Sequence, residues 1–106
     1  MDEPEQLNVE FIGFSDTDSF EKSKVESKAF NTFRKLARIT KHPDTHLSIH
    51  LREQALEGKR RKYSIHSRLV CPGHSFDSTH DEWNFLTAVE KSLSSLEREV
   101  IKKLKR

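Results

Sequence analysis

Apolar and polar residues alternate in three stretches of the chain, which is the pattern of β-strands with one buried face. These stretches are residues 7–11, 45–52 and 62–71. In each of them, every second side chain is predicted to point into a core. A shorter fourth strand is predicted at residues 74–78, directly after the turn dipeptide Pro72-Gly73.

Two longer stretches repeat apolar residues at intervals of three or four, which is the period of an amphipathic helix. Each opens with a capping-box pattern, Asp18 with Glu21 and Thr79 with Glu82, which predicts where the helix begins. Pro43 is expected to end the first helix, because proline has no amide hydrogen to donate. The first apolar stripe consists of Val25, Ala29, Phe33, Leu36 and Thr40. The second consists of Leu86, Val89, Leu93, Leu96 and Val100, extended by Trp83 and Leu104.

The order of these elements predicts an α+β fold of the form β-α-β-β-β-α. Because each strand has one apolar face and each helix one apolar stripe, both helices should pack on one face of a four-stranded, mostly antiparallel sheet. Residues 1–5 are expected to form a disordered acidic N-terminus, and residues 6–106 a single domain. A chain of 106 residues needs no disulfide to fold, and its one cysteine, Cys71, cannot form an internal one.

The charges are distributed unevenly along the chain. Residues 1–21 contain seven acidic residues and no lysine or arginine, so the remainder holds all 19 basic residues against ten acidic ones. Such a surplus attracts phosphates if it gathers on one face, and is an ordinary solvated surface if it does not. No long apolar run or signal peptide is visible, so we expect a cytoplasmic protein with no membrane partner.

The sequence contains no glycine-rich phosphate loop, no nucleophile elbow and no zinc-protease motif, so an enzyme is not expected. Cys71, His74 and His80 have a spacing that could bring ligands to zinc. However, Cys71 falls on the apolar side of its strand, where a thiol acts as a small hydrophobic group. We therefore expect no metal and no cofactor.

Three histidines share the polar face of the predicted sheet with Arg68: His46, His50 and His66. Imidazoles in such a place can stack on nucleic-acid bases or bond to a backbone. The plainer interpretation, which we prefer, is that they are ordinary residues on a half-exposed sheet.

The basic residues form one group on each helix and a third, Lys59-Arg60-Arg61-Lys62, before a strand. Helices packed side by side expose neighbouring outer faces, so the helix-borne bases are predicted to form one RNA-binding surface. Lysines at a helix C-terminus also stabilise the helix dipole, which is a structural reason for some of them.

The second helix resembles that of the ribosome hibernation-promoting factor family, which includes the ribosome-associated inhibitors. The residues that carry the resemblance are 84–90 (Asn-Phe-Leu-Thr-Ala-Val-Glu), followed by Leu96-Glu97-Arg98-Glu99-Val100. The opening Val9-Glu10-Phe11-Ile12-Gly13 is similar to the family's first strand. Asn84 stands where the family usually has Asp, and Leu86 where it has Tyr.

The resemblance implies two parallel helices on one side of a four-stranded sheet, and binding to rRNA in the decoding channel of the small ribosomal subunit. A protein there would silence and preserve idle ribosomes by competing with messenger and transfer RNA. The long C-terminal extension of some members is absent, so pairing of ribosomes would need a second, dimerising factor. The residues expected to bind RNA are Lys24, Lys28, Arg34, Lys35, Arg38, Arg98, Lys102, Lys103 and Arg106.

Three alternatives remain open from the sequence. A generic double-stranded-RNA-binding module has a related fold, but usually carries lysines where this chain has the acidic stretch 79–82. A protein-interaction domain would use exposed aromatic residues, for which Phe14, Phe76 and Trp83 are the candidates. A small metal-dependent enzyme would use the cysteine and histidine cluster described above.

Overall fold

The computed structural model describes residues 8–14, 17–55 and 61–104. The acidic residues 1–5 and the basic group at 59–60 lie outside this part of the chain. The elements follow the order β1 (Val9–Ile12), α2 (Ser19–Thr40), β2 (His46–Ala55), β3 (Arg61–Cys71), β4 (His74–Glu82) and α3 (Phe85–Leu104). The predicted β-α-β-β-β-α order is therefore confirmed.

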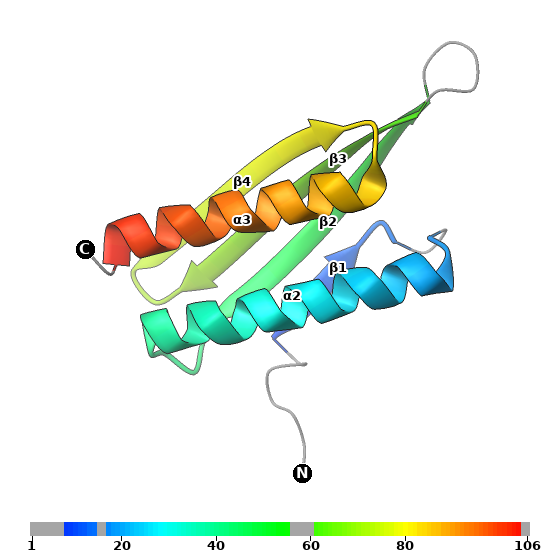
Figure 1. The fold of residues 1–106 in the computed structure, drawn as a ribbon. Coiled ribbons are helices and arrows are strands. Elements are labelled where there is room, and N and C mark those ends of the chain that lie inside the picture. Colours follow the sequence, from blue (N-terminus) through cyan, green and yellow to red (C-terminus); the bar gives the residue numbers. More distant parts are fainter. Residues whose placement is uncertain (1–7, 15–16, 56–60, 105–106) are drawn as a thin grey trace.

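The four strands form one sheet in the order β1-β2-β3-β4. β1 runs parallel to β2, while β2–β3 and β3–β4 are antiparallel pairs. Both helices lie on the same side of this sheet and run in the same direction (Figure 1). The crossover through α2 allows β1 to lie parallel to β2, and the three later strands follow as a meander.

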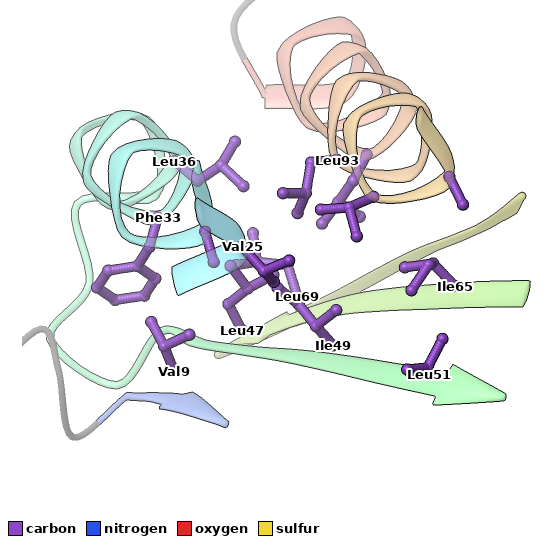
Figure 2. Close-up of a cluster of buried hydrophobic side chains, with 14 of the residues drawn as sticks. Val9, Val25, Phe33, Leu36, Leu47, Ile49, Leu51, Ile65, Leu69 and Leu93 are labelled. Carbon is purple, nitrogen blue, oxygen red and sulfur yellow. The ribbon is translucent and has the colours of Figure 1, made fainter. Parts of the chain in front are cut away.

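The core lies between the helices and the sheet, where the alternating strand residues meet the helix stripes (Figure 2). Leu47, Ile49, Ile65 and Leu69 are fully buried on the inner face of the sheet. The fully or almost fully buried helix residues facing them are Val25, Ala29, Phe33, Leu36, Ala88, Val89, Leu93, Leu96 and Val100. Burial of each large aliphatic side chain contributes about 1.5–3 kcal/mol, so this layer is the main source of stability.

One buried polar contact fixes α3 on the sheet. The Ser67 hydroxyl of β3 lies 2.8 Å from the Ser92 hydroxyl of α3, and Ser92 Oγ donates to the Ser78 carbonyl at 3.1 Å. Because Ser92 uses its proton on that carbonyl, Ser67 is the donor to Ser92. These hydrogen bonds satisfy the hydroxyls of Ser67 and Ser92, and burial of each hydroxyl without a partner would cost about 1–3 kcal/mol.

The first helix begins where its capping pattern predicts, because Asp18 accepts a hydrogen bond from the Glu21 amide at 3.3 Å. It ends at Thr40, before Pro43 is reached. Lys41 adopts a left-handed conformation with φ of 59°, and its amide closes the last turn on the Ala37 carbonyl. Pro43 therefore lies in the connection to β2 rather than at the end of the helix.

The predicted start of the second helix is wrong. Thr79 and Glu82 belong to β4, where they pair with His66 and Tyr63, and this strand is longer than the predicted 74–78. The helix cap is Asn84 instead, whose side-chain oxygen accepts from the Thr87 amide at 3.0 Å. A capping box supplies two local hydrogen bonds, whereas the same residues in β4 complete a ladder with β3.

The position of Trp83 also differs from the prediction. It precedes α3 instead of extending its stripe, and 48% of its surface is exposed. Phe85 takes the first buried position of α3. The strand β2 likewise continues to Ala55, past the predicted end at residue 52.

We expect the backbone at Gly13 to tolerate no side chain. Its φ is +85°, and a Cβ there would lie 2.4 Å from the Leu51 carbonyl oxygen. Gly73 is the matched control, since its φ is +83° but a Cβ would meet nothing within 4 Å. In urea unfolding, G73A should lose about 1–2 kcal/mol for its left-handed backbone. G13A should lose about 1–3 kcal/mol more for the overlap; equal losses would show that Leu51 moves away without cost.

Candidate nucleic-acid interface

The predicted RNA-binding bases of α2 gather on one side of the helix. Lys24, Lys28, Lys35 and Arg38 follow one another at spacings of three, four or seven residues, which places them along one row. Lys28, Arg34, Lys35 and Arg38 line one shallow hollow together with Asn31 and Thr32. The structure thus brings the predicted bases of α2 together.

Arg98 of α3 does not join this group. It lines a different hollow on the β4 side of α3, formed by His80, Glu90, Lys91, Ser94, Ser95 and Arg98. Three of the lining residues take part in polar contacts. His80 lies 3.1 Å from the Ser95 hydroxyl, and Lys91 forms an ion pair of 2.9 Å with Glu82.

Two carboxylates of α3 lie between the two groups of bases. Lys28 Nζ is 3.5 Å from Glu90, and Lys35 Nζ is 3.5 Å from Glu97. The two pairs are seven residues apart on each helix, so they repeat along the seam where α2 meets α3. Arg98 is one residue, or about 100° of helix rotation, beyond Glu97. One continuous basic face across both helices is therefore not formed.

The ion pairs at the seam are half-exposed, and such pairs contribute only about 0–1 kcal/mol to stability. Their larger effect is on the surface charge, because each carboxylate offsets one of the lysines that were predicted to bind RNA. Lys24 is also engaged, since its ammonium lies 4.5 Å from the centre of the Phe20 ring. Lys24, Lys28 and Lys35 are consequently less available to phosphates than the other predicted RNA-binding residues.

The remaining bases gather toward one end of the molecule. Because α2 and α3 run in the same direction, their C-termini lie at the same end (Figure 1). Arg34 has a neutral partner, the Asn31 side chain at 2.9 Å. We call the following exposed residues of the two C-terminal halves the basic pole: Arg34, Arg38, Arg98, Lys102 and Lys103.

Within the described part of the chain, no carboxylate forms an ion pair with any residue of the basic pole. Lys102 and Lys103 lie in the last turn of α3 and Arg38 in that of α2, where cations also favour the helix dipole. Arg106 was predicted to bind RNA as well, and it lies outside the described residues.

The sequence-based prediction missed His80 and Lys91, which neighbour Arg98. His80 was assigned to the region where the second helix was thought to begin. Its alternation with Phe76 and Ser78 on the inner side of β4 was the signal that could have placed it on a strand.

The cysteine and histidine cluster does not form a metal centre in the described residues, which contain no group of three or more potential ligands. Cys71 is buried, and this burial raises the pKa of its thiol. His74 is its cross-strand partner, but it is exposed and stacks on Phe76 with 5.9 Å between ring centres. His80 faces Ser95 as described above.

The aromatic candidates for a protein-binding surface are mostly part of the core. Phe14 and Phe76 are 3% and 8% exposed, and Phe14 packs edge-on against Phe11 and Phe85. Of the three candidates, Trp83 alone is exposed, with Lys62 Nζ 5.5 Å from its ring centre. The protein-interaction hypothesis therefore loses two of its three residues.

Comparison with solved structures shows that this fold is known. The chain is similar to the N-terminal domain of Protein Y from Thermus thermophilus, with a TM-score of 0.56 and 17% identity over 89% of this chain and 92% of that one. It is also similar to a ribosomal subunit interface protein from Coxiella burnetii, with a TM-score of 0.51 and 16% identity over 93% of this chain and 97% of that one.

At these identities the likeness establishes a shared fold, and it agrees with the fold that the family resemblance implied. No family model and no curated protein matches the sequence. Neither helix in the described residues has an apolar stretch long enough to span a lipid bilayer.

We predict that the Cys71 thiol is unreactive in the folded protein. Because burial raises its pKa, less of it is thiolate at neutral pH, and the buried sulfur is also hard to reach. Alkylation by iodoacetamide, followed by mass spectrometry, should be at least about tenfold slower than in the same protein unfolded in urea. Equal rates would show that the β3–β4 turn opens readily.

Proposed function

We propose that this protein binds the small ribosomal subunit through rRNA and thereby inhibits translation. The observation that carries the proposal is the basic pole, an end of the molecule where exposed arginines and lysines of two parallel helices have no carboxylate partners in the described structure. The fold shared with a ribosomal subunit interface protein, and the family resemblance in α3, support the ribosome as the partner.

Charge of this kind recognises RNA by the position of its phosphates rather than by its bases. If the basic pole neutralises about five phosphates, affinity should fall with salt at a slope of roughly −4 on a double logarithmic scale. Raising the salt from about 50 to 200 mM would then weaken binding by roughly two orders of magnitude. Binding at low salt and release at high salt are therefore expected.

The decoding channel is the proposed place of binding, as the family resemblance implies. A compact two-layer domain with cations at one end suits a passage lined by phosphates. Its occupancy would exclude messenger and transfer RNA, so the protein would act by competition and needs no catalytic group. This is the mechanism by which it would keep ribosomes idle in the cytoplasm.

A generic double-stranded-RNA module is less well supported by the structure. The helix that would carry its lysine cluster is capped by Asn84 and begins at Phe85, and its first turn contains no lysine or arginine. Three of the bases of α3, Arg98, Lys102 and Lys103, lie toward the other end of that helix.

Reversing charge at the basic pole should abolish ribosome binding. We expect R34E/R38E to migrate free of ribosomes in a sucrose gradient at low salt, while the wild type co-sediments with small subunits or whole ribosomes. The control is K22E/R68E, which changes the net charge equally at the start of α2 and on the outer face of the sheet. Both variants should keep a melting temperature near that of the wild type, because all four residues are on the surface.

Loss of binding in both variants alike would mean that net charge matters rather than its position. Free migration of the wild type at low salt, with ribosomes in excess, would refute the ribosome as partner.

Removing the carboxylates at the helix seam should strengthen binding. In E90Q/E97Q, Lys28 and Lys35 lose their ion-pair partners and become available to phosphates. We expect the affinity for small subunits to rise severalfold in a filter-binding assay. The control E26Q/D77N removes two negative charges away from the seam and should change affinity less. An equal rise in both would argue against any contact of the seam with RNA.

A further inference from the structure

The face of the sheet that points away from the helices carries a hollow of its own, with a volume of about 200 Å³. It is lined by His50, Arg52, Ser64, His66 and Thr79, which we call the sheet-face hollow. Three neighbouring strands supply these residues: His50 pairs with His66, Arg52 with Ser64, and His66 with Thr79. Since alternate residues of a strand share a face, the pairing places all five side chains on the same side.

The lining groups can all donate hydrogen bonds to an anion. Arg52 brings a guanidinium, Ser64 and Thr79 bring hydroxyls, and each imidazole can present an N–H. No carboxylate of the described residues lines the hollow. A donor set of this kind, with one permanent positive charge, matches the oxygens of a phosphate group.

The two histidines strengthen this match. His50 and His66 are directly opposite each other on adjacent strands, where Cβ atoms are about 4.5–5.5 Å apart. At that distance, the N–H groups of both imidazoles can reach the same anion. The acidic residues on neighbouring positions of the same face are Asp81, opposite Ser64, Asp77, opposite Arg68, and Glu10, opposite Ser48.

Arg52 and Arg68 differ in whether their guanidinium groups have a hydrogen-bond partner. Arg68 donates to the Ser75 hydroxyl at 3.3 Å and has Asp77 as its cross-strand neighbour. Arg52 is exposed and forms no hydrogen bond or ion pair within the described residues. The cross-strand neighbour of Arg52 is the neutral Ser64, so no carboxylate stands directly opposite Arg52 on β3.

The space is sufficient for such a ligand. A volume of about 200 Å³ is several times the roughly 30 Å³ that a water molecule takes up in the liquid. The hollow also opens on the solvent side of the sheet, which no helix covers (Figure 1). A phosphate group at the end or in the middle of a chain can therefore enter it.

We propose that the sheet-face hollow is a phosphate-binding site. It lies on the face of the sheet opposite to the helices, so it is separate from the basic pole and does not depend on ribosome binding. Arg52 and the two histidines hold the phosphate oxygens, and the hydroxyls of Ser64 and Thr79 complete the contacts. The phosphate belongs either to the backbone of single-stranded RNA or to a small free anion.

The test is a titration of the isotopically labelled full chain, followed by NMR through the histidine ring signals and the backbone amides. The probes are inorganic phosphate and a tetranucleotide of uridine, both at low ionic strength. Either probe should shift the signals of His50 and His66. The variant R52Q should weaken the binding at least about tenfold, as loss of a charge-assisted hydrogen bond implies. The matched control R68Q lies on the same face outside the hollow and should change it less than about twofold.

Tighter binding of the tetranucleotide identifies RNA backbone as the source of the phosphate, and equal or tighter binding of inorganic phosphate identifies a small anion. The proposal is overturned if neither probe moves the two histidines, or if R52Q and R68Q weaken binding equally. Co-sedimentation of R34E/R38E tests the basic pole and the titration of R52Q tests the hollow, so failure of one proposal leaves the other in place.

Discussion

The requirement to cover one apolar sheet face determines on which surfaces the charged groups of the described residues lie. The inner sheet residues and both helix stripes can leave water only by packing against each other, and the fold has a single layer in which this happens. The helices must therefore lie next to each other on one side. The chain enters both of them from the same end, so their C-termini meet at the opposite end (Figure 1). The outer face of the sheet is left to water, and polar residues occupy most of it, with Ile12 and Val70 as exposed apolar exceptions.

Charge on the helix side follows from this packing in two opposing ways. Parallel helices bring Lys28 to Glu90 and Lys35 to Glu97, which joins the helices but cancels part of the positive surface. The bases of the basic pole form no ion pair within the described residues and are left exposed in the C-terminal halves of both helices. An interface with RNA built on this molecule would thus be concentrated at one end. The fold alone does not select this function, because folds host many functions and only the site decides.

The two faces of the molecule offer different chemistry to nucleic acid. The helix side presents long, exposed cations on two helices, which attract phosphates over a broad area. The outer face of the sheet presents short side chains held by a regular ladder, with His50, His66 and Arg52 around one small hollow. Rigid placement by strands favours recognition of a single group, whereas exposed arginines and lysines spread over two helices favour a broad field. The protein therefore has one surface suited to attraction and another suited to a specific contact.

The sequence by itself determined the order of elements, the inward faces of β2 and β3 and the stripes of both helices, because burial follows period-two and period-3.6 patterns that are local. Only the tertiary structure decided that Thr79–Glu82 is strand, since its partners on β3 lie more than ten residues away and outweigh a local cap. The tertiary structure also decided which basic residues of the two helices form no ion pair in the described part of the chain. The rotation of α3 against α2 puts Glu97 beside Lys35 and turns Arg98 away, and that rotation depends on how side chains interlock across the seam. No pattern within either helix alone contains that information.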